Sequence, residues 1–138
     1  FWAILFRLAE AGTTILVSTH YMDEAERCHR LAILDRGVKV ADGTPRELQA
    51  STGMHIVEVT GEDPYHAQKA LDCAEHIASV TQLGVRLRVL VPERHDQPVE
   101  LVRRHLDAHD VVADVQLSTA SLEDVFVAVT MGSEERVA

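Results

Sequence analysis

Hydrophobic and polar positions divide the chain into two successive series of elements, residues 1–52 and 53–131. The chain opens on residues 1–11, which carry bulky apolar groups at nearly every turn and predict a helix packed on a sheet, with Gly12 as its C-cap. Residues 13–18 follow as a β-branched and aliphatic run. Such a run is typical of a buried parallel strand.

The rest of the first series predicts short elements. Residues 23–30 hold acidic side chains in the first turn and basic ones in the last, which predicts a short helix because both ends complement the helix dipole. Residues 31–41 form two apolar runs around a loop, and predict a hairpin with Gly37 in the left-handed conformation. Thr44, followed by proline and glutamate, predicts a capped helix that ends near Gly53.

The second series alternates strand and helix patterns. The expected elements are strands at 55–59, 77–80, 85–91 and 111–117, and helices at 63–74, 98–108 and from Ser121 to about Thr130. Ser121 is expected to cap the last helix, with Asp124 near its N3 position. This β-α-β-β-α-β order with a final helix predicts a ferredoxin-like domain, so the expected fold class is α/β of the α+β kind. Residues 132–138 are expected to form a disordered tail.

Composition narrows the function classes. The chain has 138 residues, of which 46% are hydrophobic and 25% charged, as expected of a globular protein. Residues 1–53 hold six basic against seven acidic side chains, and residues 54–138 hold seven against fifteen. An acidic second half argues against a nucleic-acid or anionic-lipid partner. The sequence shows neither a membrane span nor a secretory signal, and begins at Phe1 within a helix pattern, so we expect a longer parent protein.

Other candidate chemistry is weak. Cys28 and Cys73 lack metal-type spacing and are expected to be free, buried thiols of a cytoplasmic protein. His105 and His109 could share a helix face for a metal, but without a third ligand a solvated face is favoured, so no metal site is expected. Two arginines on the 85–91 strand could bind an anion, although pairing with nearby carboxylates is favoured.

His20 lies just after the predicted buried strand, before the acidic start of the next helix. The carboxyl ends of parallel strands are where α/β sheets place ligands. An imidazole there could polarise a bound group, since its proton occupancy changes near neutral pH. The alternative is a histidine that merely flanks the following helix.

The first series resembles the C-terminal end of the ATP-binding subunit of ABC transporters. The resemblance rests on GTTILVSTH at 12–20, MDEAE at 22–26, RLAILDRG at 30–37 and ADGTP at 41–45. The second series is similar to the accessory C-terminal domain of the drug-efflux branch, in which Ser121 to Phe126 (SLEDVF) matches the closing segment. The resemblance therefore implies the remnant of a P-loop NTPase core in residues 1–52 and an accessory domain in residues 53–131.

The resemblance implies that His20 is the switch histidine, which contacts the γ-phosphate of ATP across a subunit sandwich. It also implies ATP and Mg²⁺ as cofactors of the full-length parent, which would couple ATP hydrolysis to export. The implied partners are a transmembrane permease subunit and a second ATP-binding subunit or domain. The implied location is cytoplasmic, peripheral on the inner membrane through the permease.

Several parts of the family's ATP site have no match in these 138 residues. The sequence holds no Gly-x-x-x-x-Gly-Lys-Ser/Thr loop, signature Leu-Ser-Gly-Gly-Gln or acidic strand for magnesium. We therefore expect this fragment to bind no cofactor and to be inactive alone. Without the rest of the core, residues 1–20 should be rearranged, disordered or completed by a second copy, giving a swapped homo-oligomer.

Two other function classes stay open. Residues 54–130 could form a stand-alone ferredoxin-like module that senses a ligand or dimerises, with no ATPase role. The eight histidines leave a metal-binding protein as a third class.

Overall fold

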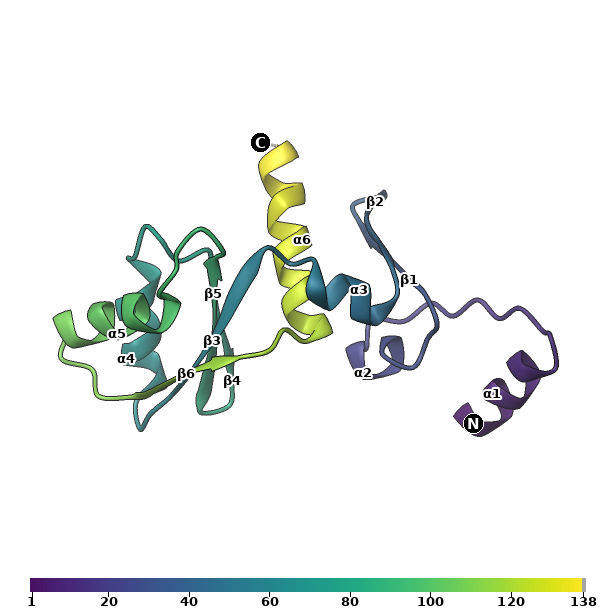
Figure 1. The fold of residues 1–138 in the computed structure, drawn as a ribbon, viewed down its shortest axis with the longest axis horizontal. Coiled ribbons are helices and arrows are strands. Elements are labelled where there is room, and N and C mark those ends of the chain that lie inside the picture. Colours follow the sequence, from purple (N-terminus) through teal and green to yellow (C-terminus); the bar gives the residue numbers. More distant parts are fainter. Residues whose placement is uncertain (138) are drawn as a thin grey trace.

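The fold was analysed in a computed structural model that describes the backbone of residues 1–137 and the side chains of residues 1–131. It is a mixed α/β fold of the α+β kind, with two antiparallel sheets and six helices in that range (Figure 1). The elements are α1 (Trp2–Glu10), α2 (Met22–Ala25), β1 (Leu31–Asp35), β2 (Val38–Gly43), α3 (Pro45–Ala50), β3 (Met54–Thr60), α4 (Pro64–Asp72), β4 (Ser79–Leu83), β5 (Arg86–Pro92), α5 (Pro98–Ala108), β6 (Asp114–Ser118) and α6 (Leu122–Val137).

The larger sheet has the strand order β4-β5-β3-β6, and every neighbouring pair is antiparallel. Its core face carries alternate residues of the strands, such as Val57 and Val59 of β3 and Val89 of β5. Helices α4 and α5 cover this face, and Leu71 and Leu106 belong to the same buried cluster. The sheet is therefore a two-layer unit with its own hydrophobic core.

The opposite face of this sheet meets α6 (Figure 1). From there α6 also packs against α2, α3 and the β1–β2 hairpin. A second buried cluster forms at this contact, in which Leu122 and Val125 of α6 meet Ala25 of α2 and Leu48 of α3. Helix α6 thus connects the sheet unit with the elements that precede residue 53.

In the first series, the predicted hairpin turn and the predicted helix cap are confirmed, and both depend on residues that are close together in the sequence. The hairpin forms with a two-residue loop in which Arg36 has φ 51° and Gly37 has φ 79°. Positive φ at both positions is the two-residue turn that suits the twist of paired strands. The Thr44 side chain accepts a hydrogen bond from Glu47 N, while Glu47 Oε2 accepts one from Thr44 N at 3.0 Å. The predicted capping box is therefore present.

Replacing Thr44 by alanine should lower the free energy of unfolding by about 1 kcal/mol, because the helix then loses one side-chain acceptor for its first-turn amides. Thr44→Ser is the matched control, since it retains the hydroxyl and should unfold close to the wild type. Urea denaturation followed by circular dichroism measures both variants. An equal loss for serine and alanine would show that the hydroxyl is not the stabilising group.

The predicted buried strand at residues 13–18 is wrong. Neither sheet includes this segment, and Leu16 is 99% exposed. A parallel strand depends on neighbours for its backbone hydrogen bonds, and the described residues place none beside it. Helix α1 does form, but it buries none of its residues, so its predicted packing on a sheet is also wrong. Swapping with a second copy stays a prediction.

Gly12 follows the C-cap Ala11 of α1 with φ 99°. Its amide donates to Ala9 O at 3.0 Å, and Thr13 N donates to Leu8 O at 3.0 Å. These two bonds are those of a Schellman motif, in which a left-handed glycine ends a helix. The predicted end of the first helix is thus confirmed, although the helix lies away from the sheets (Figure 1).

The boundaries of three other elements differ from those predicted. The helix expected over residues 23–30 is a single turn, Met22–Ala25, and the strand expected over 111–117 is Asp114–Ser118. Helix α6 extends beyond the expected end near Thr130, and the expected disordered tail, residues 132–138, lies outside the fully described residues. No helix within residues 1–137 has the length and apolar character that crossing a membrane requires.

Both cysteines are free, as predicted, but they are not both buried. Cys28 is half-buried and lies 3.7 Å from Glu24 O, whereas Cys73 is exposed. Cys73 is the C-cap of α4, whereas Ala70 and Leu71 of that helix belong to the buried cluster.

Candidate functional site

His20 is exposed at the end of the extended segment that joins α1 to α2. Its ring lies against Tyr21, with ring centroids 4.1 Å apart. Thr19 Oγ1 accepts a hydrogen bond from Tyr21 N at 3.0 Å and donates to Glu24 Oε1 at 2.6 Å. Thr19 thus bonds to the local backbone and to Glu24 at the start of α2, while the imidazole of His20 is exposed.

A densely bonded polar cluster lies between the large sheet and α6, and Arg88 of β5 is at its centre. The Arg88 guanidinium donates to both carboxylate oxygens of Asp124, at 3.3 Å from Nε and 2.5 Å from Nη2. It also donates to Glu58 Oε2 at 3.2 Å, Ser118 Oγ at 3.3 Å and the Thr119 carbonyl at 2.9 Å. We call these five residues the α6 joint.

Asp124 has two roles in the α6 joint. It is 4% exposed, and its Oδ2 accepts hydrogen bonds from Ser121 N at 2.8 Å and Ser121 Oγ at 3.0 Å. Ser121 Oγ in turn accepts from Asp124 N at 3.4 Å, so the predicted N-terminal cap of α6 is present. The same carboxylate therefore takes part in the N-terminal cap of α6 and binds the sheet through Arg88.

In the α6 joint, the acidic partners and burial shift the pKa of Arg88 in opposite directions. Hydrogen bonding to Asp124 raises the pKa of the Arg88 guanidinium above its ordinary value, whereas desolvation opposes the shift. Arg86, the next arginine on the same strand face, pairs with Glu58 at 3.2 Å but is mostly exposed. Both arginines pair with carboxylates, as the sequence favoured, and the alternative of an anion site is not supported.

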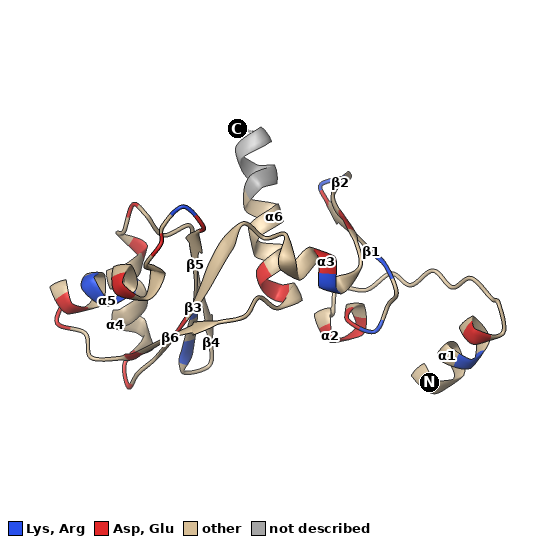
Figure 2. Cartoon of the chain, in the orientation of Figure 1, with Lys and Arg blue, Asp and Glu red and all other residues tan. Residues whose placement is uncertain are grey.

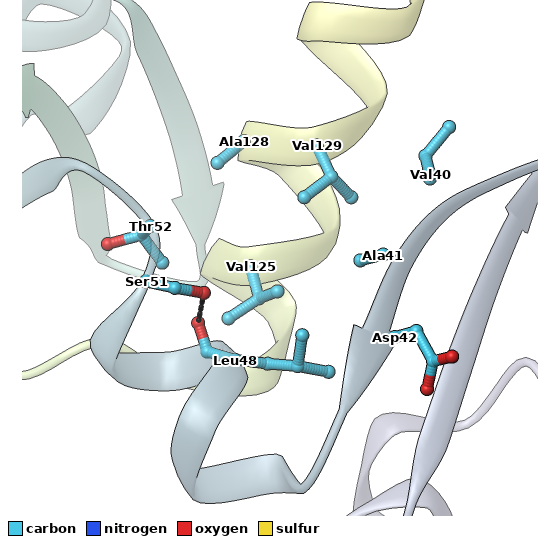
Figure 3. A pocket seen from close by; sticks show the side chains of 9 residues that line it. All are labelled: Val40, Ala41, Asp42, Leu48, Ser51, Thr52, Val125, Ala128 and Val129. Carbon is cyan, nitrogen blue, oxygen red and sulfur yellow. Dashed lines mark hydrogen bonds between the residues drawn. The ribbon is translucent and has the colours of Figure 1, made fainter.

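A shallow pocket of about 290 Å³ lies between α6, β2 and the C-terminal end of α3 (Figure 3). Its lining is Val40, Ala41, Asp42, Leu48, Ser51, Thr52, Val125, Ala128 and Val129. Most of these side chains are small and apolar, and the Ser51 hydroxyl is already bonded to Leu48 O at 3.1 Å. Asp42 is the one charged residue of the lining, and its pKa is lowered by hydrogen bonds from Lys39 and Arg30. This pocket has no convergent set of groups for catalysis.

Figure 2 marks acidic residues on α2, at the start of α6 and around α4 and α5. Basic side chains are fewer and scattered, with one group on the β4–β5 hairpin, where Arg86 and Arg88 are paired to carboxylates. This distribution lacks the concentrated basic surface that a nucleic-acid backbone requires.

His105 and His109 have no third candidate metal ligand grouped with them in the part of the chain that the structure describes. His109 Nδ1 lies 2.9 Å from the His105 carbonyl oxygen, so one nitrogen of the His109 ring is engaged with the backbone of the preceding helix. Within the described part of the chain, no group of three or more His, Cys, Asp or Glu side chains is placed to hold a metal ion.

The Arg88–Asp124 pair was not predicted from the sequence. The two residues are 36 positions apart, and the register of β5 against α6 is a tertiary property. Two signals pointed toward it, since arginines at every second position of β5 were expected to find carboxylates, and Asp124 was expected three residues after the Ser121 cap. Neither signal named the partner.

Known proteins related to this chain were compared by sequence. The chain is 34% identical over 142 aligned positions, 94% of its own length, to the daunorubicin/doxorubicin resistance ATP-binding protein DrrA of Streptomyces peucetius. It is 44% identical over 72 positions, 51% of its length, to the Nod factor export ATP-binding protein I of Burkholderia pseudomallei. The corresponding protein of Paraburkholderia xenovorans is 48% identical over 65 positions, 46% of the chain.

The alignments cover part of each relative. The chain spans 40% of the length of the Streptomyces protein, 24% of the Burkholderia protein and 21% of the Paraburkholderia protein. No protein-family model matches the chain.

Proposed function

We propose that this chain, whose homologues are ABC transporter ATP-binding proteins of export systems, is the C-terminal part of such a subunit. The observation that carries the proposal is the alignment to a resistance ATP-binding protein over 94% of the chain. The whole protein would then bind ATP with Mg²⁺ and use hydrolysis to drive export. Its partners would be a transmembrane permease and a second ATP-binding subunit or domain, at the cytoplasmic face of the inner membrane.

In the whole protein, His20 would act as the switch histidine at the γ-phosphate. Phosphoryl transfer depends on donors positioned around the transferred group, and an imidazole N–H at the end of a strand can be such a donor. Exposure of His20 in this chain is compatible with a residue whose partners come from other segments. The remaining groups of the ATP site would come from those segments too.

Residues 53–131 would form the accessory domain, with the ferredoxin-like arrangement. The antiparallel order β4-β5-β3-β6 and two helices on one face are the features that support this proposal. The α6 joint would then set the orientation of the accessory domain, because α6 contacts both the sheet and the elements before residue 53. A role in regulation or dimer contact follows from that position.

The test is ATP hydrolysis by the full-length protein encoded by the gene. We expect Mg²⁺-dependent hydrolysis, and His20→Ala should lower kcat about 100-fold, since a single positioned donor to transition-state charge contributes on that order. His29→Ala is the matched control, because His29 is also exposed nearby and should leave kcat unchanged. The 138-residue chain itself should show no micromolar binding of Mg-ATP by calorimetry.

Two results would overturn the proposal. A full-length protein that lacks a phosphate-binding loop and hydrolyses no ATP would remove the transporter function. Equal loss of kcat in His20→Ala and His29→Ala would instead remove the assigned role of His20 and leave the ATPase function in place.

The self-contained core of the sheet unit favours a second candidate, a stand-alone sensing or dimerisation module. Its buried cluster is distinct from the cluster that joins α6 to α2 and α3. A small-molecule library screened by thermal shift against residues 53–131 distinguishes the two, because a sensing module should be stabilised by a ligand without any nucleotide. An export subunit should show no such dependence.

A further inference from the structure

Three histidines that the ATP-binding proposal does not use come together at one end of the large sheet. His55 lies near the start of β3 and is paired in register with Val91 of β5, and His95 follows β5 after a turn in which its N–H donates to Pro92 O at 3.1 Å. His76 lies in the loop before β4, where Ala78 N donates to Leu90 O at 2.8 Å. The pairing of β3, β4 and β5 therefore brings two separate loops to the same end of the sheet.

The rings of His76 and His95 lie side by side, at a separation that leaves room for one ion between their nitrogens. Their centroids are 5.0 Å apart and their planes are inclined by 59°. A zinc–nitrogen bond of about 2.0 Å places each ring centre about 3.2 Å from the ion, so tetrahedral coordination separates two ring centres by about 5.2 Å. The observed separation agrees with that value.

His95 also has an unused ligand atom. Its Nε2 is buried and, among the described residues, has no hydrogen-bond partner. A buried polar atom without a partner is unfavourable unless a water or an ion satisfies it.

We propose that His76 and His95 bind one divalent transition-metal ion of the zinc class, with water completing the coordination. Imidazole nitrogen is a ligand that Zn²⁺, Ni²⁺ and Cu²⁺ share, and the separation of the rings favours the tetrahedral geometry of zinc. Water completes the site because the described residues offer no third protein ligand in place. The ion would link the loop before β4 to the loop after β5.

The test is a calorimetric titration of the 138-residue chain with Zn²⁺ at neutral pH. We expect one saturable site, with affinity at least about tenfold lower in His76→Ala and in His95→Gln, because each variant removes one of two protein ligands. His66→Ala and His105→Ala are matched controls on α4 and α5, and should bind as the wild type does. Co²⁺ in place of Zn²⁺ should give the intense visible absorption of a tetrahedral site.

His76 is exposed, so His76→Ala keeps the test valid if His95→Gln fails to fold. The proposal is overturned if the wild type has no saturable zinc site, or if His76→Ala binds zinc as tightly as the wild type. It is also overturned if the two control variants weaken binding as much as His76→Ala does, since binding would then be spread over surface histidines.

Discussion

Arg88→Met should lower the free energy of unfolding by about 3–5 kcal/mol, the typical effect of removing one partner of a buried ion pair. The Arg88 side chain is 14% exposed, and it bonds to Asp124, to Glu58 and to two further groups at the end of β6 and in the loop that follows it. Methionine fills a similar volume but leaves the buried Asp124 carboxylate without its cation. The variant also removes the bonds that tie α6 to the sheet. Guanidinium denaturation followed by circular dichroism measures the effect.

Arg86→Met is the matched control for Arg88→Met. Arg86 lies on the same face of the same strand and pairs with the same Glu58, but its side chain is 63% exposed. An exposed pair of this kind contributes about 0–1 kcal/mol. If the two variants unfold at the same denaturant concentration, the buried pair does not stabilise the fold and the α6 joint has no structural role.

Leu106→Ala should lower the free energy of unfolding by about 2–5 kcal/mol, because it opens a cavity where α5 packs on the sheet. Leu106 belongs to the fully buried cluster that also contains Val57, Leu71 and Val89. Thermal or urea unfolding of the chain measures the loss. The variant should fold to the same secondary structure, since no polar group is left unpaired.

Leu117→Ala is the control for the cavity explanation. Leu117 lies on β6 with 61% of its surface exposed, so its truncation should change the free energy of unfolding by no more than about 0.5 kcal/mol. Equal losses at the two positions would mean that strand or helix propensity, and not the buried core, accounts for the effect of Leu106→Ala.

Elements of this protein that depend on local contacts could be predicted from the sequence. The Thr44 capping box, the left-handed Gly37 of the hairpin and the Ser121 cap of α6 each depend on residues within four positions of one another. The helix over Pro98–Ala108 was predicted to the residue, since its apolar period is regular and its first position is proline. The similar proteins are ATP-binding proteins of export or resistance systems, which agrees with the resemblance that rests on residues 12–45.

Elements that form only through contacts with distant segments could not be predicted in this way. The apolar run at residues 13–18 has the composition of a buried strand, yet it is exposed, because a strand exists only where other strands accept its hydrogen bonds. His20, which follows that run, therefore stands alone as a candidate catalytic residue whose role stays a prediction.

By itself, the sequence determined the caps, turns and alternating faces of this protein, and its relationship to ATP-binding proteins, since these depend on neighbouring residues or on residue order. Only the tertiary structure decided which charged side chains form ion pairs. Arg88 and Asp124 are 36 positions apart and become partners because α6 crosses the face of the sheet opposite α4 and α5. His76 and His95 likewise lie at the same end of the sheet because β4 and β5 are paired neighbours.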